Sequence, residues 1–456
     1  MREILVTIAG RSSAAFQSLA RFAGLDRAIG FTLLNYILSA LVLPLSLFLV
    51  AHFFSPTAQG FYFTFSSILA LQVVFELGFS QCITQFASHE FAHLSFLPDN
   101  TLTGDGISLG RLLALAKLAL KWYLLAAVLV FIGIGVGGYW FFSFRSSGEI
   151  QWVKPWILVC WATALNLIVV PCFSLLEGCN RIPGTAAIRC AASLARALVL
   201  CVAIVSGFQL YSIGLAVLAY CFVCAAGLLY HFLPFYRQLL GRAAEQDLSW
   251  RKEIWPFQWK IALSWLSGYF VFQMFTPVLF RFHGPIPAGR FGMTWALIQG
   301  ISGVATAWGS TKVPRYGMLI KLRKFDDLDE LWRGATIKSV IVSALGGGVL
   351  LAGTWILKHH SQLGTRFLDI VPAFYLVLAT VLNQIVFGQA FYLRSHKQEP
   401  FLALSLVGGI ATALLVWWSG KLYSATGVSI SYLLVAAALL PWASVIYLRC
   451  RRQWHI

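Results

Sequence analysis

The chain has 456 residues, of which 59% are hydrophobic and only 11% are charged. A soluble domain is roughly a quarter charged, so this composition excludes an ordinary soluble protein. The net charge of +17 is typical of nucleic-acid binding in a soluble chain. A membrane protein instead concentrates Lys and Arg in its cytoplasmic loops, and we expect no nucleic-acid partner.

Long apolar segments recur along the whole chain and predict helices that cross a membrane. In hydrocarbon each segment must satisfy its own backbone amides, as a helix does, and no segment alternates like the strands of a membrane barrel. Segments near the roughly 20 residues that cross a bilayer occupy residues 28–52, 61–83, 120–142, 154–176, 183–205, 210–232, 255–280, 291–311, 334–357, 367–391, 399–419 and 424–447. The predicted fold class is all-α integral membrane, with about twelve transmembrane helices.

The Lys and Arg residues predict the orientation. With a cytoplasmic N-terminus, 25 of them fall in cytoplasmic segments and 7 in external loops, while Arg189 and Arg196 lie inside the fifth predicted helix. The positive-inside rule favours this orientation, and an even number of helices places the C-terminus in the cytoplasm too. Residues 1–27 have arginines among Phe and Leu and predict an amphipathic cytoplasmic segment rather than a cleavable signal peptide.

A basic segment, residues 237–254, divides the chain into two halves of six predicted helices, residues 28–236 and 255–456. A weak internal similarity crosses this division at a constant offset of 230 residues. Ala58, Phe61, Thr64 and Ile68 match Ala288, Phe291, Thr294 and Ile298. Repeated halves are a common plan of secondary transporters, whose binding site lies between the repeats near the middle of the membrane.

Glu76 lies about fifteen residues into the second predicted helix and is the acidic residue predicted at membrane depth. An ionisable group there is costly and is a functional candidate by default. Two interpretations stand side by side. The carboxylate either takes part in ion coupling, or it is structural, neutralised by an arginine or simply protonated.

Arg189 and Arg196 are seven residues apart and form one stripe with Ser193 on the fifth predicted helix. Each arginine costs roughly 2.5 to 3.5 kcal/mol at the centre of a membrane helix. We therefore expect both to face the bundle interior or a wet cavity rather than lipid. They either bind an anionic substrate or pair with Glu177 or Glu76.

The seventh predicted helix is unusually polar for a membrane span, with Lys260, Tyr269 and Gln273 among its residues. Gly268 and Pro277 are tolerated in such a helix because neighbouring groups satisfy the backbone, and they predict a loosened segment suited to gating. Its aromatic and amide side chains suit a sugar, although its tryptophans are also typical of an interfacial belt.

Asp326, Asp327 and Asp329 form a DxD pattern of the kind that a metal-dependent glycosyltransferase uses. The pattern lies in a charged amphipathic segment in which Lys324 and Arg333 are possible partners, so a solvated helix face is the favoured interpretation. The chain has no GxxxxGK[ST], HExxH or GxSxG motif. We expect neither a cofactor nor a metal.

Three segments resemble a known family: QGFYFTFSSILALQVVFELGFSQCITQFASHE (59–90), PCFSLLEGCNRI (171–182) and WPFQWKIALSWLSGYFVFQMFTPVLFRFHGPIPAGRFGMT (255–294). They are similar to bacterial oligosaccharide and polysaccharide flippases of the superfamily that also holds multidrug and toxin extrusion (MATE) antiporters. The resemblance implies a MATE-like pair of six-helix lobes around a central cavity. It also implies alternating access and a polyprenyl-pyrophosphate-linked oligosaccharide as cargo, moved across the bacterial inner membrane for surface polysaccharide synthesis.

One departure from the wider superfamily affects ion coupling. Some MATE antiporters have an acidic residue in the first helix, where this chain offers only Asn35, so Glu76 becomes the candidate carboxylate. Two rival functions stay open. A MATE-like exporter of cationic drugs favours an acidic, aromatic cavity, and a membrane-embedded glycosyltransferase or polymerase needs catalytic carboxylates at an interface.

We therefore expect a multi-pass transporter of the inner membrane rather than an enzyme. Its predicted partners are a lipid-linked oligosaccharide, membrane lipids and other polysaccharide assembly proteins, and its predicted ion-coupling residue is Glu76. The predicted substrate contacts are Arg189, Arg196, Lys260, Tyr269, Gln273, Arg281, Arg290 and Gln299.

Overall fold

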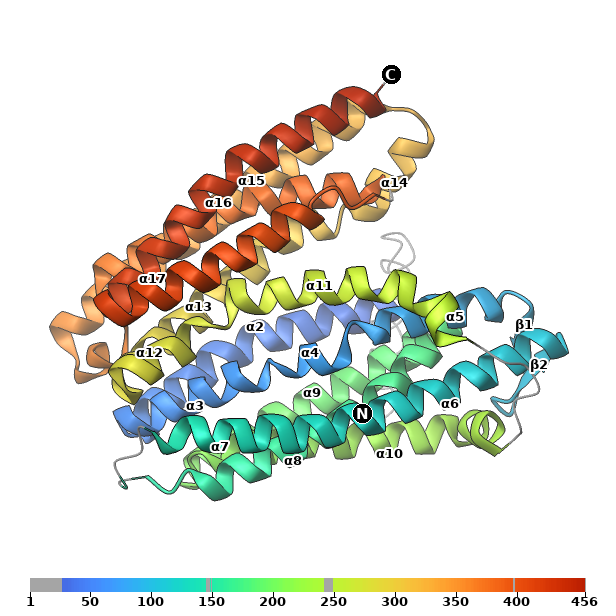
Figure 1. Ribbon diagram of the computed structural model, residues 1–456, viewed down its shortest axis with the longest axis horizontal. Coiled ribbons are helices and arrows are strands. Elements are labelled where there is room, and N and C mark those ends of the chain that lie inside the picture. Colours follow the sequence, from blue (N-terminus) through green and yellow to red (C-terminus); the bar gives the residue numbers. More distant parts are fainter. Residues whose placement is uncertain (1–26, 145–147, 149, 242–248, 397, 456) are drawn as a thin grey trace, which may run out of the picture.

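The computed structural model describes residues 27–144, 148, 150–241, 249–396 and 398–455. The amphipathic segment predicted for residues 1–27 lies outside this description except for its last residue. The described chain forms two helical bundles that converge at one end and diverge at the other (Figure 1). The all-α membrane fold with two lobes is confirmed, while the exact domain boundaries stay a prediction.

The first half contains nine α-helices, one π-helical turn and a small hairpin among its described residues. These are α2 (Arg27–Phe53), α3 (Pro56–Leu69), α4 (Gln72–Glu76), α5 (Phe79–Phe91), β1 (Leu94–Phe96), β2 (Leu102–Gly104), α6 (Gly106–Leu129), η1 (Val130–Ile134), α7 (Gly135–Ser143), α8 (Val153–Gly178), α9 (Ile182–Val205) and α10 (Tyr211–Gly241).

The second half begins with a π-helical turn and continues as a second bundle. Its elements are η2 (Trp250–Ile254), α11 (Trp255–Phe272), α12 (Phe275–His283), α13 (Pro285–Ser310), α14 (Val313–Lys321), α15 (Phe325–His360), the 3-10 helix η3 (Gln362–Arg366), α16 (Ile370–Ser395) and α17 (Leu402–Trp454).

Eight helices of the described chain are long and apolar enough to cross a membrane, and a ninth span is formed if the pair α11 and α12, bent by 46°, is one span. In that count α17 is a single span, yet its 53 residues are broken at Ser424, where φ is 54° and ψ is −142°. An unbroken helix of this length would extend about 80 Å, against a hydrocarbon core of about 30 Å. The break follows residue 419 and coincides with the start of the last predicted span, so α17 contains the last two spans.

The second predicted span differs from the continuous helix that we expected over residues 61–83. It is divided into α3, α4 and α5, and the boundary between α4 and α5 lies at Leu77 and Gly78, which adopt left-handed backbone angles with φ of 51° and 64°. A Cβ atom at position 78 would lie 2.3 Å from Cγ2 of Ile261 in α11. The break therefore lets α11 pack closely against this span, and it leaves Glu76 as the last residue of α4.

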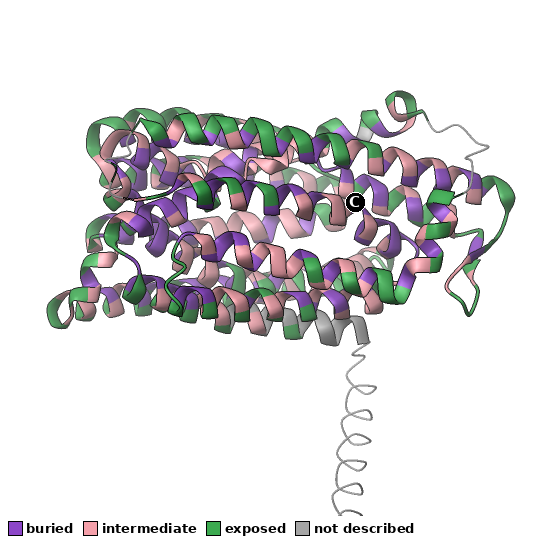
Figure 2. Cartoon of the chain, turned by 90° about the horizontal axis from the view of Figure 1, so that it is seen from below, coloured by how far each residue is buried: buried purple, intermediate pink, exposed green. Residues whose placement is uncertain are grey.

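Large apolar side chains cover the outer faces of both bundles, as expected for surfaces that face lipid. Phe222, Val349 and Trp418 are each at least 70% exposed. Figure 2 shows exposed residues along the outside of the helices and buried residues between them. The inside of each bundle is thus packed, while its outside is apolar.

The internal similarity between the halves marks the place where they touch. All eight matched residues are buried. Helices α3 and α13 cross there so closely that a Cβ atom on Gly289 would lie 2.8 Å from the backbone nitrogen of Gly60. Thr64 donates to the carbonyl of Gly60 at 2.7 Å, and its equivalent Thr294 donates to the carbonyl of Arg290 at 3.1 Å. The repeated residues therefore lie on the two helices whose crossing joins the halves.

A set of hydrogen bonds ties the halves together at the end where the bundles converge (Figure 1). Gln59 Nε2 in α3 donates to the carbonyl oxygens of Gly289 and Arg366, each at 3.0 Å. Arg366 Nη2, at the end of η3, donates to the carbonyl oxygen of Phe54 at 2.6 Å. We call these three residues, Phe54, Gln59 and Arg366, the latch.

The segment that precedes α11 is attached to the first half at the opposite end. Arg111 of α6 forms ion pairs with Glu90 at 2.8 Å and with Glu253 of η2 at 2.7 Å. The rings of Trp250 and Trp122 lie 5.5 Å apart. The hydrogen bond from Arg111 holds the pKa of Glu253 below its ordinary value. The start of α11 is therefore fastened to α6.

The connection between α5 and α6 contains the β1–β2 hairpin. Its two strands are antiparallel and pair Leu94 with Gly104 and Phe96 with Leu102. Asp105 then caps α6 by accepting a hydrogen bond from the backbone nitrogen of Ser108 at 2.8 Å. Backbone and side-chain hydrogen bonds from Ser108 lower the pKa of Asp105.

Candidate functional site

A polar cavity of about 910 Å³ opens within the first half. Its walls come from α3, α4, α5, α8, α9 and α10, and Trp265 of α11 is the contribution of the second half. The polar side chains that line it are Ser66, Gln72, Ser80, Gln81, Thr84, Gln85, Thr163, Asn166, Ser174, Glu177, Arg189, Ser193, Arg196 and Tyr220. We call it the first-half cavity.

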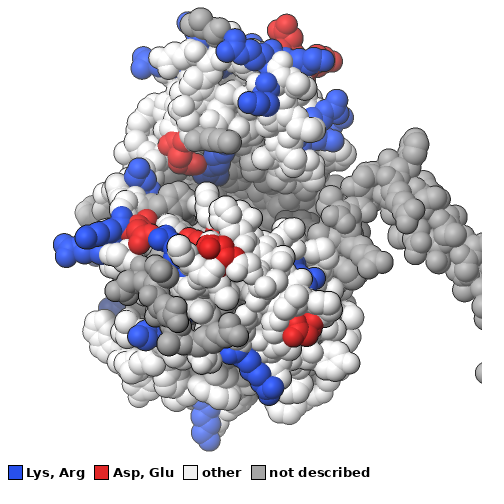
Figure 3. All heavy atoms as spheres, turned by 90° about the vertical axis from the view of Figure 1, so that its right-hand side faces the viewer, with Lys and Arg blue, Asp and Glu red and all other residues white. Residues whose placement is uncertain are grey.

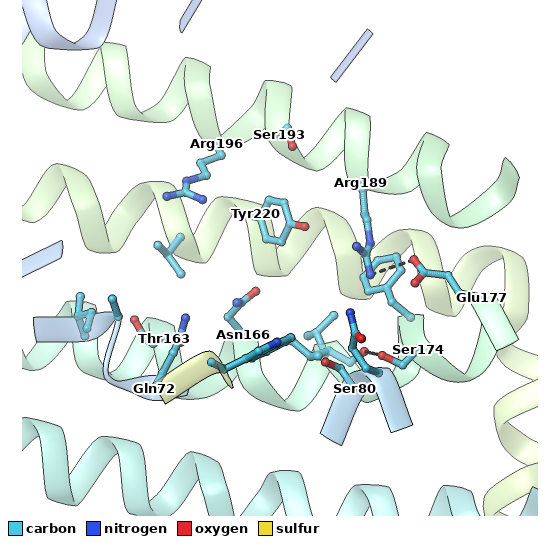
Figure 4. Close-up of a pocket in the computed structure, with 18 of the residues that line it drawn as sticks. Gln72, Ser80, Thr163, Asn166, Ser174, Glu177, Arg189, Ser193, Arg196 and Tyr220 are labelled. Atoms are coloured by element: carbon cyan, nitrogen blue, oxygen red, sulfur yellow. Dashed lines mark hydrogen bonds and ion pairs between the residues drawn. The ribbon is translucent and has the colours of Figure 1, made fainter. Parts of the chain in front are cut away.

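Both arginines of the fifth predicted span line this cavity. Seven residues are about two helical turns, so Arg189 and Arg196 lie on the same face of α9, with Ser193 between them. In Figure 4 they point into the cavity from α9, opposite Asn166 of α8. Both arginines therefore face a polar cavity rather than lipid. Their role in substrate binding stays a prediction.

Arg189 pairs with one of the two carboxylates that the sequence offered. Its Nη2 lies 3.0 Å from Oε1 of Glu177, and its guanidinium carbon lies 4.6 Å from the centre of the Phe173 ring. Its Nε is buried and has no hydrogen-bond partner in the described structure. The ion pair thus fixes one edge of the guanidinium and leaves a donor unused.

Arg196 makes the cavity cationic. No described carboxylate lies within ion-pair distance of it. Arg196 is exposed and forms part of the cavity wall. With Arg189 and Glu177 the lining therefore has one net positive charge. An anionic ligand is the natural complement of such a site.

Amide and aromatic side chains complete the cavity, and the sequence did not single them out. Gln72 comes from α4, Asn166 from α8, Tyr220 from α10 and Trp265 from α11. The Oε1 atom of Gln72 is buried without a partner in the described chain. Amides and rings of this kind can bind the hydroxyls and faces of a sugar.

Glu76 lies behind the wall of the cavity rather than in it. Its Oε1 accepts hydrogen bonds from Tyr123 Oη at 3.0 Å and from Ser80 Oγ at 2.5 Å, and Ser80 itself lines the cavity. The partners of Glu76 in the described structure are hydroxyls and not an arginine. Ser80 thus connects this carboxylate with the cavity, and its role in ion coupling stays a prediction.

The other predicted residues of the seventh span do not line the first-half cavity. Lys260 is exposed, with Nζ 5.9 Å from the ring centre of Trp259. Tyr269 is buried, and Gln273 lies at the break between α11 and α12. Instead, α11 contributes Trp265 to the lining. The sequence alone did not distinguish this tryptophan from the others in the same helix.

Three further predicted residues are also separated from the arginines. The guanidinium carbon of Arg281, in α12, lies 4.4 Å from the ring centre of Phe144, and Arg290 is an exposed residue near the start of α13. Gln299 lines a different cavity. Of the eight predicted substrate contacts, the first-half cavity therefore brings together only Arg189 and Arg196.

Gln299 belongs to a cavity of about 460 Å³ between α11, α13 and α16, which we call the second-half cavity. Its lining has no Lys, Arg, Asp or Glu. Behind it the buried side chain of Gln384 accepts from Thr306 Oγ1 at 3.1 Å and from Ser339 Oγ at 2.8 Å, and donates to Ser302 Oγ at 2.9 Å. This cavity is lined by neutral hydrogen-bonding groups.

The DxD pattern does not form a cluster around one point. Asp329 forms an ion pair with Arg451 and accepts a hydrogen bond from Tyr392 Oη at 3.0 Å, whereas Asp326 and Asp327 are exposed. The partner of Asp329 is thus at the end of the chain and not the neighbouring lysine or arginine that we expected. Across the described residues, no group of three His, Cys, Asp or Glu side chains is placed to hold a metal.

Solved structures share this architecture over most of the chain. The lipid II flippase MurJ in an inward closed conformation has a TM-score of 0.65 at 12% identity, over 91% of this chain and 87% of that chain. An inward-facing MATE-family multidrug resistance transporter of the MOP superfamily has a TM-score of 0.62 at 14% identity, over 91% and 96% of the two chains. An outward-facing structure of such a transporter has a TM-score of 0.53 at 15% identity, over 94% and 97%.

No family model and no curated protein matches the chain. The structural likeness extends over both lobes and agrees with the membrane-length helices. The chain is a multi-pass membrane protein with the all-α fold of the MOP-superfamily transporters.

Proposed function

We propose that this protein is a flippase that translocates a polyprenyl-pyrophosphate-linked oligosaccharide across the bacterial inner membrane for surface polysaccharide biosynthesis. The observation that carries the proposal is the pair Arg189 and Arg196 in a polar cavity of a membrane bundle. Arginine binds phosphate oxygens through a planar fork of donors. A pyrophosphate therefore explains why two costly cations face one cavity.

The rest of the lining suits the remainder of such a cargo. Gln72, Asn166 and Thr163 offer donors and acceptors for sugar hydroxyls, and Tyr220 and Trp265 offer ring faces. The apolar outer faces of the helices adjoin lipid, where a polyprenyl chain stays during transport. The cargo class is thus an amphiphile with an anionic junction between its sugar and its lipid.

The fold supports alternating access. The bundles touch at the α3–α13 crossing and the latch and diverge toward the other end (Figure 1), so opening of the converged end requires the latch to break. We propose Glu76 as the ion-coupling group, because a carboxylate held by Tyr123 and Ser80 next to the cavity can exchange a proton when the cavity changes its exposure. Membrane potential acting on the cavity charges is the alternative source of coupling.

The fold neighbours include both a lipid II flippase and MATE-family transporters. The sign of the cavity charge favours the first kind of cargo, because a drug cation gains nothing from two arginines that outnumber a single glutamate. The glycosyltransferase alternative receives less support, since Asp329 is paired with Arg451 while Asp326 and Asp327 are exposed.

Deletion of the gene tests the proposal. We expect loss of a surface polysaccharide and accumulation of its lipid-linked oligosaccharide in the inner leaflet, both restored by the intact gene. The Arg189→Ala, Arg196→Ala variant at equal membrane abundance should reproduce the deletion. The matched control is Arg323→Ala, which removes an exposed arginine that lines neither cavity and should restore the polysaccharide. Unchanged polysaccharide together with new sensitivity to cationic drugs would favour the MATE-like alternative.

A further inference from the structure

A third cavity, of about 510 Å³, lies between the end of α13, α14 and the first turns of α15. Lys312, Arg315 and Lys338 line it together with Asp327 and Glu330. All of its lining residues fall between positions 308 and 338, so it shares no residue with the first-half cavity. It is a separate site with charges of both signs.

The helix lengths place this cavity at the level of lipid headgroups. The 36 residues of α15 extend about 54 Å, against a hydrocarbon core of about 30 Å, so the charged first turns of α15 lie outside the hydrocarbon. The predicted spans at residues 291–311 and 334–357 put Lys312 just beyond one span and Lys338 just inside the other. Figure 3 looks onto this end of the molecule and shows many Lys and Arg side chains over the second-half bundle.

An apolar surface leads from the cavity along the outside of α15. Ile337, Ile341 and Leu345 are 51%, 49% and 66% exposed, and a spacing of four residues aligns them on one face of the helix. Trp308, which lines the cavity, is 44% exposed. Lys338 Nζ lies 5.8 Å from the centre of its ring. Acyl chains therefore have an apolar path that starts at the charged cavity.

The charged side chains that line the cavity do not form ion pairs with one another. The ion pairs found within the described chain include none of the three cations and neither of the two carboxylates. The lining has one net positive charge, from three cations and two carboxylates. Its complement is a ligand with one negative charge and additional hydrogen-bond donors.

We propose that this cavity binds the headgroup of an anionic glycerophospholipid of the phosphatidylglycerol type. Its phosphodiester oxygens accept hydrogen bonds from Lys312, Arg315 and Lys338, and its headgroup hydroxyls donate to Asp327 and Glu330. Its acyl chains lie along the exposed apolar face of α15. Basic pockets between membrane helices are known to bind anionic headgroups, and the ligand here is a resident lipid of the bilayer and not the transported cargo.

Lipid binding to the delipidated full-length protein tests the site. We would measure the affinities of phosphatidylglycerol, phosphatidylethanolamine and phosphatidylcholine by native mass spectrometry. The variant Lys312→Gln, Arg315→Gln, Lys338→Gln should bind phosphatidylglycerol at least about tenfold more weakly than the intact protein, because each cation near a headgroup contributes roughly fivefold. The matched control Lys321→Gln, Arg323→Gln, Lys324→Gln removes three exposed cations that do not line the cavity and should bind normally.

Three outcomes would overturn the proposal. Equal weakening by both triple variants would show attraction to overall surface charge. Equal affinity of the intact protein for phosphatidylglycerol and phosphatidylcholine would exclude headgroup recognition, and a preference for phosphatidylethanolamine would show recognition of an ammonium group instead. If the first triple variant does not fold, Lys338→Gln replaces it, with an expected loss of about fivefold; unchanged binding by that variant would equally reject the site.

Discussion

The two halves of the chain share a helical plan but surround cavities of different chemistry. The first-half cavity contains Arg189, Arg196 and Glu177, whereas the second-half cavity around Gln299 is lined without ionisable acidic or basic side chains. Charged groups in a membrane bundle are costly and neutral amides are less so. The two halves thus share their helical arrangement, while the charged groups that we propose to bind an anionic cargo lie in the first half.

The largest expected effect is the loss of the two cations. The Arg189→Ala, Arg196→Ala variant should reduce translocation by roughly 100-fold, since each charged hydrogen bond to phosphate is worth about 1.5 to 3 kcal/mol. Arg196→Lys should retain part of the activity, because charge remains while the planar fork is lost. Accumulated lipid-linked oligosaccharide at matched membrane abundance measures both. Normal translocation by the double variant would remove these arginines from the site.

The crossing of α3 and α13 should tolerate no added side-chain atom. A Cβ atom on Gly60 would lie 2.0 Å from the carbonyl oxygen of Pro285, so Gly60→Ala should lower the free energy of unfolding by about 1 to 3 kcal/mol. Gly348→Ala is the matched control, because no atom lies within 4 Å of its added Cβ. Thermal unfolding in detergent compares the two. An equally stable Gly60→Ala variant would contradict the close contact of the halves.

The second-half cavity should be important for packing rather than for charge recognition. Gln384→Leu removes the amide group that forms hydrogen bonds with Ser302, Thr306 and Ser339. We expect the free energy of unfolding to fall by about 0.6 to 1.7 kcal/mol. Binding of a prenyl pyrophosphate should stay normal in the variant that still folds. Calorimetric titration of that ligand checks this, and a large loss of pyrophosphate affinity would show that the anionic junction extends into the second half.

Glu76→Gln separates coupling from structure. Gln resembles the protonated carboxyl group and keeps hydrogen bonding with Tyr123 and Ser80, so we expect a folded protein whose transport no longer responds to pH. Transport in vesicles at imposed pH gradients measures the response. Asp326→Asn changes an exposed carboxylate that lines none of the three cavities and serves as the control. If Glu76→Gln keeps the normal pH dependence, the coupling role is wrong and a structural role remains.

The smallest expected effect concerns the attachment of η2 to α6. The hydrogen bond from Arg111 lowers the pKa of Glu253, so the ion pair should contribute fully above the ordinary Glu value of about 4.3 and be lost as pH falls through the lowered pKa. The difference in melting temperature between the intact protein and Glu253→Gln should thus be constant from pH 8 to about pH 5 and shrink only below that range. Asp326→Asn, an exposed carboxylate without a described ion pair, should show no such difference.

Hydrophobic length and the cost of charge were sufficient to predict a bundle of membrane-length helices and the inward direction of Arg189 and Arg196. Both properties depend on the solvent that surrounds a helix, which sequence reports directly. The break at Leu77 and Gly78 was not predictable in the same way, because it depends on the close approach of Ile261 from another helix. A single glycine in an apolar segment does not indicate which residue of another helix will pack against it.

The neutral part of the candidate site was missed for a related reason. Gln72, Asn166 and Trp265 come from three separate elements and converge only in the folded bundle. The latch residue Gln59 was also not identified from the sequence, although it donates a hydrogen bond to the carbonyl of Gly289, the equivalent position in the repeat at an offset of 230. The internal similarity carried this information, since it marked the two helices whose contact joins the halves.

Direct binding of a short-chain prenyl pyrophosphate to the purified protein tests the central claim. We predict that the intact protein and Gln299→Ala bind it with equal affinity, because Gln299 lines only the neutral second-half cavity, and that Arg189→Ala, Arg196→Ala binds at least about tenfold more weakly. Equal affinity of all three proteins would contradict the assignment of the pyrophosphate to the first half.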